Sequence, residues 1–111
     1  MLRNLTRPRR VVITGMGCIT PIGIGRESFW HGLQTGASGV RRIESFDVSD
    51  SAVKIAAEVQ NFDVSAVLRT KDLKHVPRTV PLLLAAAREA LSDAKIDTDA
   101  LTLDEQRRIG V

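Results

Sequence analysis

The feature that most constrains the fold is residues 11–25, VVITGMGCITPIGIG, where a β-branched run enters a glycine-rich stretch. Residues 11–14 lie between arginines and glycines, which is typical of a strand buried on both faces of a parallel sheet. Four glycines follow between positions 15 and 25. Glycine adopts backbone conformations that other residues avoid, so this stretch predicts a buried strand leading into a tight loop.

A phosphate-binding turn is one alternative for these glycines. A Gly-x-Gly-x-x-Gly turn lets the backbone approach a pyrophosphate and passes it to a helix amino terminus, where free N–H groups favour anions. Here Gly15 and Gly17 are followed by Thr20 at the third position, and Pro21 opposes a smooth helix start. No acidic residue ends a second strand at the required distance. The pattern therefore disfavours a nucleotide-binding domain. Whether nucleotide stabilises the fold would test this alternative.

A reactive cysteine is the second alternative for the same stretch. Cys18 would need a base or a helix amino terminus to form a thiolate, and the two histidines are His31, in an apolar helix, and His75, in a basic segment. A small thiol after a buried strand more often serves packing. One cysteine and two distant histidines also make no metal-ligand cluster, so we expect no metal site.

Two elements are expected before residue 50. Residues 27–34 predict a short helix with Gly36 as a carboxyl-terminal cap. The apolar side of this helix consists of Phe29, Trp30 and Leu33. Residues 37–47 have loop residues at both ends and predict a surface connection, anchored by Val40 and Ile43.

The next segment changes periodicity. Residues 53–59 alternate apolar and more polar side chains, which predicts a strand with one solvated face. Asp63 is a candidate amino-terminal cap for a single helical turn over residues 64–68.

The strongest helical pattern lies within residues 73–95. Apolar side chains recur there at spacings of three and four. They are Leu83, Ala86, Ala87, Ala90, Leu91 and Ala94. Thr79 is the expected cap, and Pro81 is tolerated only in the first turn. The alanines predict close packing between two neighbouring elements, and residues 107–111 predict the opening of another strand.

Composition excludes several classes of protein. The 111 residues are 43% hydrophobic, which indicates a globular chain, and no apolar run approaches the roughly 20 residues that span a bilayer. The single cysteine and the absence of a cleavage site after the basic amino terminus favour a soluble, cytoplasmic protein. With 16 Lys and Arg against 13 Asp and Glu, the net charge of +3 is modest. It provides no dense basic face with stacking aromatics, so nucleic acid is not an expected partner.

A compact basic patch precedes the long helix. Arg69, Lys71, Lys74 and His75 lie within seven residues, with Arg78 close behind. Such a patch attracts an acidic partner and steers its approach, although a solvated helix start would have the same composition.

Taken in order, separated blocks of the sequence resemble one family. These blocks are RRVVITGMGCITPIG, FWHGLQTGASGVRRIESFD, KIAAEVQNFD, AAAREALSDAKID and RRIGV. They resemble the amino-terminal part of an elongating β-ketoacyl-[acyl carrier protein] synthase of the type II fatty acid system, similar to synthase II. The resemblance divides the chain into a basic extension, residues 1–10, and the amino-terminal part of a synthase domain, residues 11–111.

The resemblance implies a thiolase-like α/β fold with α-β-α-β-α layers, of which this chain is an incomplete part, and a homodimeric enzyme. In the implied reaction, malonyl-carrier protein loses carbon dioxide and condenses with an acyl group held on a cysteine. That cysteine and the family's catalytic histidines and lysine belong to later segments, so no residue here is assigned a catalytic role. In this family the glycines of residues 11–25 would shape the first turn from strand to helix.

The resemblance also implies a partner. Basic residues before the long helix help elongating synthases dock acyl carrier protein, and that segment matches Arg69, Lys71 and Lys74. His75 and Pro77 depart from the common pattern, and Lys95 replaces the usual glycine at the end of the helix. No cofactor is implied beyond the phosphopantetheine of the carrier protein. We expect the isolated chain to be inactive; the alternative is a non-catalytic subunit that binds carrier protein or complements a separate remainder.

Overall fold

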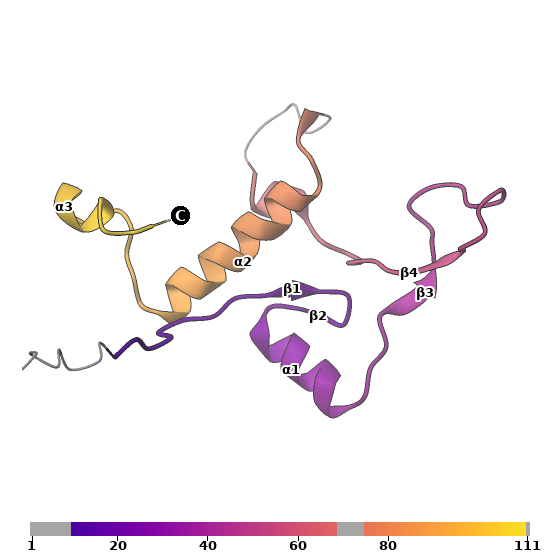
Figure 1. Ribbon diagram of the computed structural model, residues 1–111, viewed down its shortest axis with the longest axis horizontal. Helices are drawn as coiled ribbons and strands as arrows, with labels where there is room; N and C mark the ends of the chain where they lie inside the picture. Colours follow the sequence, from indigo (N-terminus) through magenta and orange to yellow (C-terminus); the bar gives the residue numbers. More distant parts are fainter. Residues whose placement is uncertain (1–9, 69–74, 111) are drawn as a thin grey trace, which may run out of the picture.

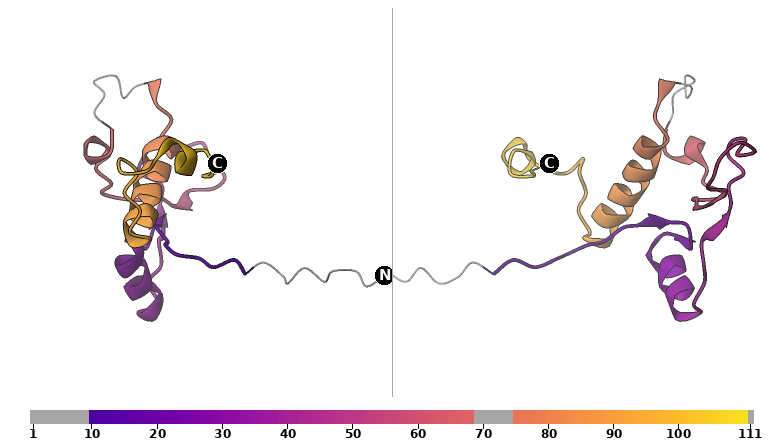
Figure 2. Two further views of the ribbon diagram at one scale, coloured as in Figure 1. Left: turned by 90° about the vertical axis from the view of Figure 1, so that its left-hand side faces the viewer. Right: turned by 45° about the vertical axis from the view of Figure 1, so that its right-hand side comes forward.

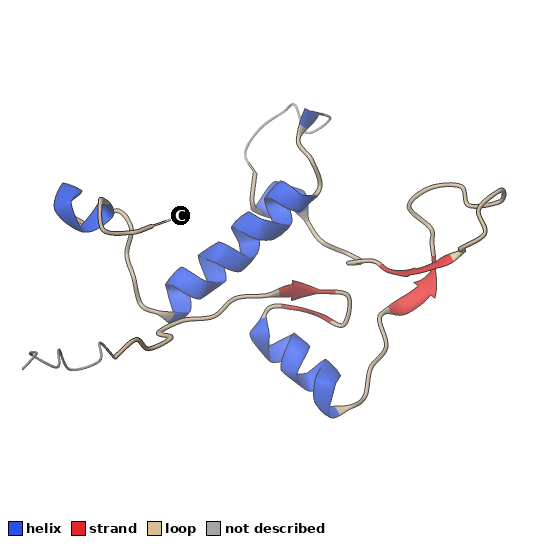
Figure 3. Ribbon diagram, in the orientation of Figure 1, coloured by secondary structure: helices blue, strands red, loops and turns tan. Residues whose placement is uncertain are grey.

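The computed structural model describes residues 10–68 and 75–110, which form a chain of short elements around one long helix (Figure 1). In order these are β1 (Ile19–Thr20), β2 (Gly23–Ile24), α1 (Arg26–Gln34), β3 (Val40–Arg42), β4 (Ile55–Ala57), the 3-10 turn η1 (Val64–Ala66), α2 (Thr79–Asp93) and α3 (Leu103–Gln106). Figure 3 shows that loops connect small regular elements, and that α2 is the dominant one.

Two small antiparallel sheets are present in the described residues. β1 pairs with β2 in a tight hairpin, with Ile19 opposite Ile24. β3 pairs with β4, with Val40 opposite Ala57. α1 packs on the first hairpin, and α2 packs on β1. The first hairpin therefore lies between the two helices, as Figures 1 and 2 show.

The prediction of a buried strand over residues 11–14 is wrong. These residues form no strand, and Val11 and Ile13 are 91% and 82% exposed. A buried strand needs neighbours that complete its hydrogen bonds and cover its faces, and no described segment pairs with this one. Figure 2 shows this stretch projecting away from the rest of the chain.

The helix predicted over residues 27–34 is confirmed as α1, and Gly36 follows it with a φ of 66°. Its apolar side is largely uncovered, because Trp30 is 61% exposed. The loop predicted over residues 37–47 is wrong in its middle, since Val40–Arg42 forms β3. The sequence pattern missed this strand because β3 depends on pairing with β4.

The strand predicted over residues 53–59 is confirmed only as β4, Ile55–Ala57. Its expected burial is wrong: Val53 and Ile55 are mostly exposed. The helical turn after Asp63 is confirmed as η1, and the Asp63 carboxylate accepts a hydrogen bond from the Ser65 N–H at 2.9 Å.

The long helix is confirmed as α2, with Pro81 in its first turn and fully buried. Thr79 is not its cap: Arg78 occupies that position, and no side chain caps the helix there. The expected packing is present on one side, where Gly15 and Gly17 touch the alanines. Leu83 is 71% exposed, so the helix is not enclosed between two described elements.

The last predicted strand is wrong in the part that the structure describes. Residues 107–110 form a turn and an irregular segment after α3. Thr102 and Glu105 build a reciprocal capping box at the start of α3, a helix that is not among the elements predicted from the sequence.

Candidate functional site

The three residues expected to dock a carrier protein, Arg69, Lys71 and Lys74, lie outside the described residues. The structure therefore describes only what flanks them. On the amino side is η1, followed by Val67, which is 8% exposed. On the carboxyl side, residues 75–78 lead directly into α2.

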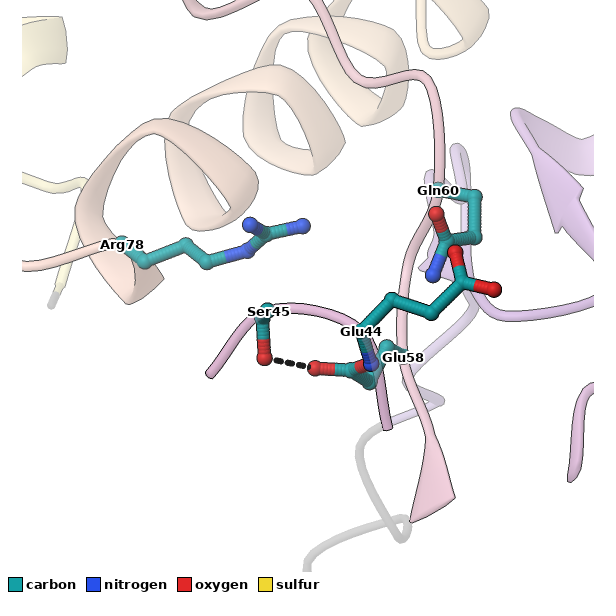
Figure 4. A pocket seen from close by; sticks show the side chains of 5 residues that line it. All are labelled: Glu44, Ser45, Glu58, Gln60 and Arg78. Atoms are coloured by element: carbon teal, nitrogen blue, oxygen red, sulfur yellow. Dashed lines mark hydrogen bonds between the residues drawn. The ribbon is translucent and has the colours of Figure 1, made fainter. Parts of the chain in front are cut away.

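A polar pocket of about 290 Å³ lies between the start of α2 and the β3–β4 hairpin (Figure 4). It is lined by Glu44, Ser45, Glu58, Gln60 and Arg78. The Ser45 hydroxyl donates to Glu58, and the Glu44 N–H donates to the same carboxylate at 3.3 Å. The Ser45 hydrogen bond, followed by that of Glu44 and by the charge of Arg78, lowers the pKa of Glu58.

A second cluster joins α2 to the glycine-rich loop. Glu89 accepts the Cys18 N–H at 3.0 Å and the Arg26 N–H at 2.8 Å. Asp93, one turn further on, accepts the Met16 N–H at 3.0 Å and pairs with the Arg26 guanidinium at 2.6 Å. The two carboxylates thus fasten the loop and the first residue of α1 to α2.

This arrangement decides against a phosphate at the glycine-rich loop. A helix amino terminus favours a nearby anion. At the amino terminus of α1 that anion is the Glu89 carboxylate. The position that a pyrophosphate would need is therefore taken by a side chain of α2.

Cys18 lies at one side of an open apolar hollow of about 750 Å³. The hollow is lined by Gly15, Met16, Gly17, Cys18, Arg26, Phe29, Trp30, Leu33 and Ala90. Burial is the largest cause that raises the pKa of the Cys18 thiol, Glu89 raises it further, and Arg26 opposes them. A raised pKa disfavours the thiolate, so these surroundings do not activate Cys18 as a nucleophile.

Neither a metal cluster nor a membrane span is present in residues 10–68 and 75–110. No three His, Cys, Asp or Glu side chains there are grouped to hold an ion. None of the helices in the same ranges is long and apolar enough to cross a bilayer.

The roles of Glu89 and Asp93 on α2 were not predicted from the sequence. Their spacing was the available signal. Two carboxylates four residues apart on a helix repel each other, so they indicate donors supplied from elsewhere in the fold. Here the Arg26 guanidinium and the backbone N–H groups of Met16, Cys18 and Arg26 supply them.

Comparison of the structure with solved structures identifies the class of fold. The chain matches the ishigamide ketosynthase/chain length factor with a TM-score of 0.73 and 39% sequence identity, over 84% of this chain and 23% of that one. It is therefore part of the α/β, thiolase-like fold of a ketosynthase, as the sequence blocks implied.

The sequence comparisons agree with this fold. The chain is 39% identical over 104 residues to 3-oxoacyl-[acyl-carrier-protein] synthase 2 of Synechocystis sp., covering 94% of this chain and 25% of that protein. It is 35% identical over 107 residues to the synthase 2 of Staphylococcus aureus strain COL, covering 96% of this chain and 25% of that protein. The chain thus spans about a quarter of the length of these relatives.

The family model for the β-ketoacyl synthase N-terminal domain matches residues 8–111. The chain belongs to the β-ketoacyl synthase family, and the resemblance inferred from the sequence blocks is confirmed.

Proposed function

We propose that this chain works as the amino-terminal part of a 3-oxoacyl-[acyl-carrier-protein] synthase that elongates fatty acids. The match of residues 8–111 to the family's amino-terminal domain carries this proposal. In the proposed reaction, an enzyme-bound acyl thioester and malonyl-carrier protein give a 3-oxoacyl-carrier protein and carbon dioxide, and the acyl-bearing thiol is released. The substrates are held on carrier-protein phosphopantetheine, and the working enzyme is a homodimer in the cytoplasm.

The 111-residue chain by itself is proposed to lack condensing activity. A condensing site needs an activated thiol and donors at the thioester oxygen. The only cysteine of the chain is Cys18, and its raised pKa supports the proposal. Release of carbon dioxide from malonyl-carrier protein that depends on the purified 111-residue polypeptide would contradict it. If this polypeptide binds carrier protein but releases no carbon dioxide from malonyl-carrier protein, the result fits both an enzyme segment and a non-catalytic subunit.

Arg69, Lys71 and Lys74 are the proposed docking residues for acyl carrier protein. The supporting observation is that three cations fall within six residues, directly before α2, in a chain of the β-ketoacyl synthase family. Cations of this kind act mainly on association with an acidic partner, and salt screens their effect.

The docking proposal is tested in a full-length synthase that carries residues 8–111. Changing Lys71→Glu together with Lys74→Glu should raise KM for malonyl-carrier protein, with a smaller effect at high salt. The matched control is Arg41→Glu with Lys54→Glu, which reverses two exposed charges near the β3–β4 hairpin. Unchanged kinetics of the Lys71/Lys74 double variant at low salt would remove this segment from docking.

A further inference from the structure

The apolar hollow of about 750 Å³ is bordered by α1, the glycine-rich loop and Ala90 of α2, and its walls are open to solvent. On α1, Trp30 and Leu33 are 61% and 50% exposed, and Met16 in the loop is 58% exposed. Single exposed apolar side chains are common on protein surfaces, whereas apolar side chains that gather in one concave patch indicate a surface that another segment covers. The hollow therefore has the character of one side of an interface.

α1 cannot cover this surface by turning, because its position is fixed at two places. A Cβ on Gly32 would meet the Ile22 carbonyl oxygen at 2.7 Å, so this side of the helix lies directly against the first hairpin. At the start of α1, the Arg26 N–H donates to Glu89 at 2.8 Å, and the Arg26 guanidinium pairs with Asp93 at 2.6 Å. The side of α1 that faces the hollow is consequently held open.

The hollow offers apolar contact and no free charge. Among the described residues that line it, Arg26 alone is charged, and Asp93 already pairs with its guanidinium. A surface of this composition is typical of the core of an obligate interface, from which charged residues are depleted. Its partner is therefore an apolar segment, and an acidic protein has nothing to bind here.

Two kinds of occupant fit such a surface: a second copy of the chain, or the rest of a longer synthase. The exposed apolar surface continues along Val11, Val12 and Ile13, which are all mostly exposed and project away from the other elements (Figure 2). A copy related by a two-fold axis would cover one side of this stretch, whereas a chain that folds around it covers several. This chain also spans only 25% of the Synechocystis synthase and 23% of the solved ketosynthase chain. Both observations favour the rest of the synthase.

We propose that the hollow bordered by Met16, Phe29, Trp30 and Leu33 is an internal docking surface, which an apolar segment of the synthase outside residues 1–111 fills in the full-length enzyme. This inference rests on the proposed function, because it requires a longer synthase. Burial of these side chains removes apolar surface from water and so stabilises the complete fold. The hollow thereby joins the amino-terminal part of the enzyme to the remainder.

The first experiment places a photoreactive residue in the hollow of the full-length synthase that carries residues 8–111. Trp30 is replaced by p-benzoylphenylalanine, the protein is irradiated, and the products are mapped by mass spectrometry. Cross-links should form within one polypeptide, to peptides outside residues 8–111. Replacement of His31 is the matched control and should give far fewer of these cross-links, since His31 is exposed on α1 and does not line the hollow.

A truncation tests the same surface through stability in the same full-length synthase. Leu33→Ala should lower Tm by about 5 °C, because contacts buried against the remainder are lost. Gln34→Ala is the control: Gln34 is the neighbouring exposed residue on α1 and does not line the hollow. This comparison carries the test if the p-benzoylphenylalanine variant fails to fold.

Cross-links from position 30 that join two polypeptides would overturn the proposal and assign the hollow to a second copy. Cross-links confined to residues 8–111, or no more frequent than those from position 31, would overturn it as well. Equal Tm values for Leu33→Ala and Gln34→Ala would have the same meaning, because the hollow would then stay open to solvent. If the full-length protein forms no 3-oxoacyl-carrier protein, the proposed function fails; an active enzyme without the expected cross-links contradicts only the docking surface.

Discussion

At the scale of single residues, Cys18 shows how surroundings set reactivity. Its N–H is held by Glu89, and the same carboxylate acts on its thiol, together with burial, to raise the thiol pKa. The folded chain thus holds the thiol proton more tightly than the unfolded chain does. The stability that this provides is complete below the unfolded pKa and is lost as pH rises through the raised folded pKa.

Alkylation of Cys18 should follow a pH profile whose midpoint lies above that of an ordinary thiol. Glu89→Gln should move the midpoint down, since it removes one cause of the raised pKa, while burial, the larger cause, keeps it above the ordinary value. The measurement is the rate of iodoacetamide labelling against pH. Glu27→Gln, an exposed carboxylate on α1, is the control and should leave the midpoint unchanged. A midpoint at or below the ordinary value would contradict the effect of burial.

Lys95 shows a residue in a conformation that its type does not favour. It follows α2 with a φ of 57°, in the left-handed region. The Ile96 N–H donates to the Leu91 carbonyl oxygen at 3.0 Å, and the Lys95 N–H donates to the Ser92 carbonyl oxygen at 3.1 Å. These bonds form a Schellman motif, in which glycine is the usual residue.

Lys95→Gly should therefore stabilise the fold by about 1 kcal/mol, because the strain of a left-handed side-chain-bearing residue is removed. Urea denaturation followed by circular dichroism measures this gain. Lys95→Ala is the matched control: it removes the same long side chain but keeps the Cβ, so no comparable gain is expected. Equal stability of the glycine and alanine variants would show that the backbone conformation costs nothing here.

At the scale of elements, the packing of α2 depends on small residues on both sides of the contact. A Cβ on Gly15 would collide with the Ala90 carbonyl oxygen, and one on Gly17 with the Ala86 carbonyl oxygen. The alanine pattern of the helix predicted such a close approach. It could not identify the partner, because the partner lies some 70 residues away in sequence and carries no periodic signal.

Gly17→Ala should destabilise the fold by roughly 1–3 kcal/mol, since the added methyl group meets backbone that cannot move aside. Gly110→Ala is the control, because a Cβ there meets nothing within 4 Å. The comparison uses the midpoints of urea denaturation for the two variants and the parent. A loss no larger than that of Gly110→Ala would mean that α2 and the loop do not pack as described.

The strands were predicted less well than the helices, for a physical reason. A helix closes its hydrogen bonds within one segment, so α1, α2 and η1 could be located from local patterns. A strand depends on a partner elsewhere, and residues 11–14 have none among residues 10–68 and 75–110. α3 was missed although its capping box, Thr102 with Glu105, is readable in the sequence.

At the scale of the whole molecule, the described residues expose much of their apolar surface. Their buried hydrophobic side chains are Val48 and Val67, with Pro81 also fully buried. The radius of gyration is 19.7 Å, whereas a compact domain of about 100 residues has a radius near 13 Å. Exposed apolar surface of this extent favours association.

The isolated 111-residue polypeptide should therefore bind a hydrophobic dye such as anilinonaphthalene sulfonate and associate as its concentration rises. Dye fluorescence and sedimentation velocity measure these two properties. The full-length synthase that carries the same residues is the control and should bind less dye per mole. If the polypeptide stays monomeric and binds no dye at any concentration measured, the exposed apolar surface is contradicted.

Local chemistry in the sequence was sufficient to predict the helices α1 and α2, the cap at Asp63 and the tight glycine-rich loop, and the resemblance of its separated blocks indicated the family. Those features depend on neighbours within a few residues or on the order of separated blocks. Only the tertiary structure showed that Glu89 occupies the amino terminus of α1, that Arg78 contacts the carbonyl of Val59, and that β3 pairs with β4. Each of these joins residues far apart in the chain, and their meeting depends on how the whole backbone folds.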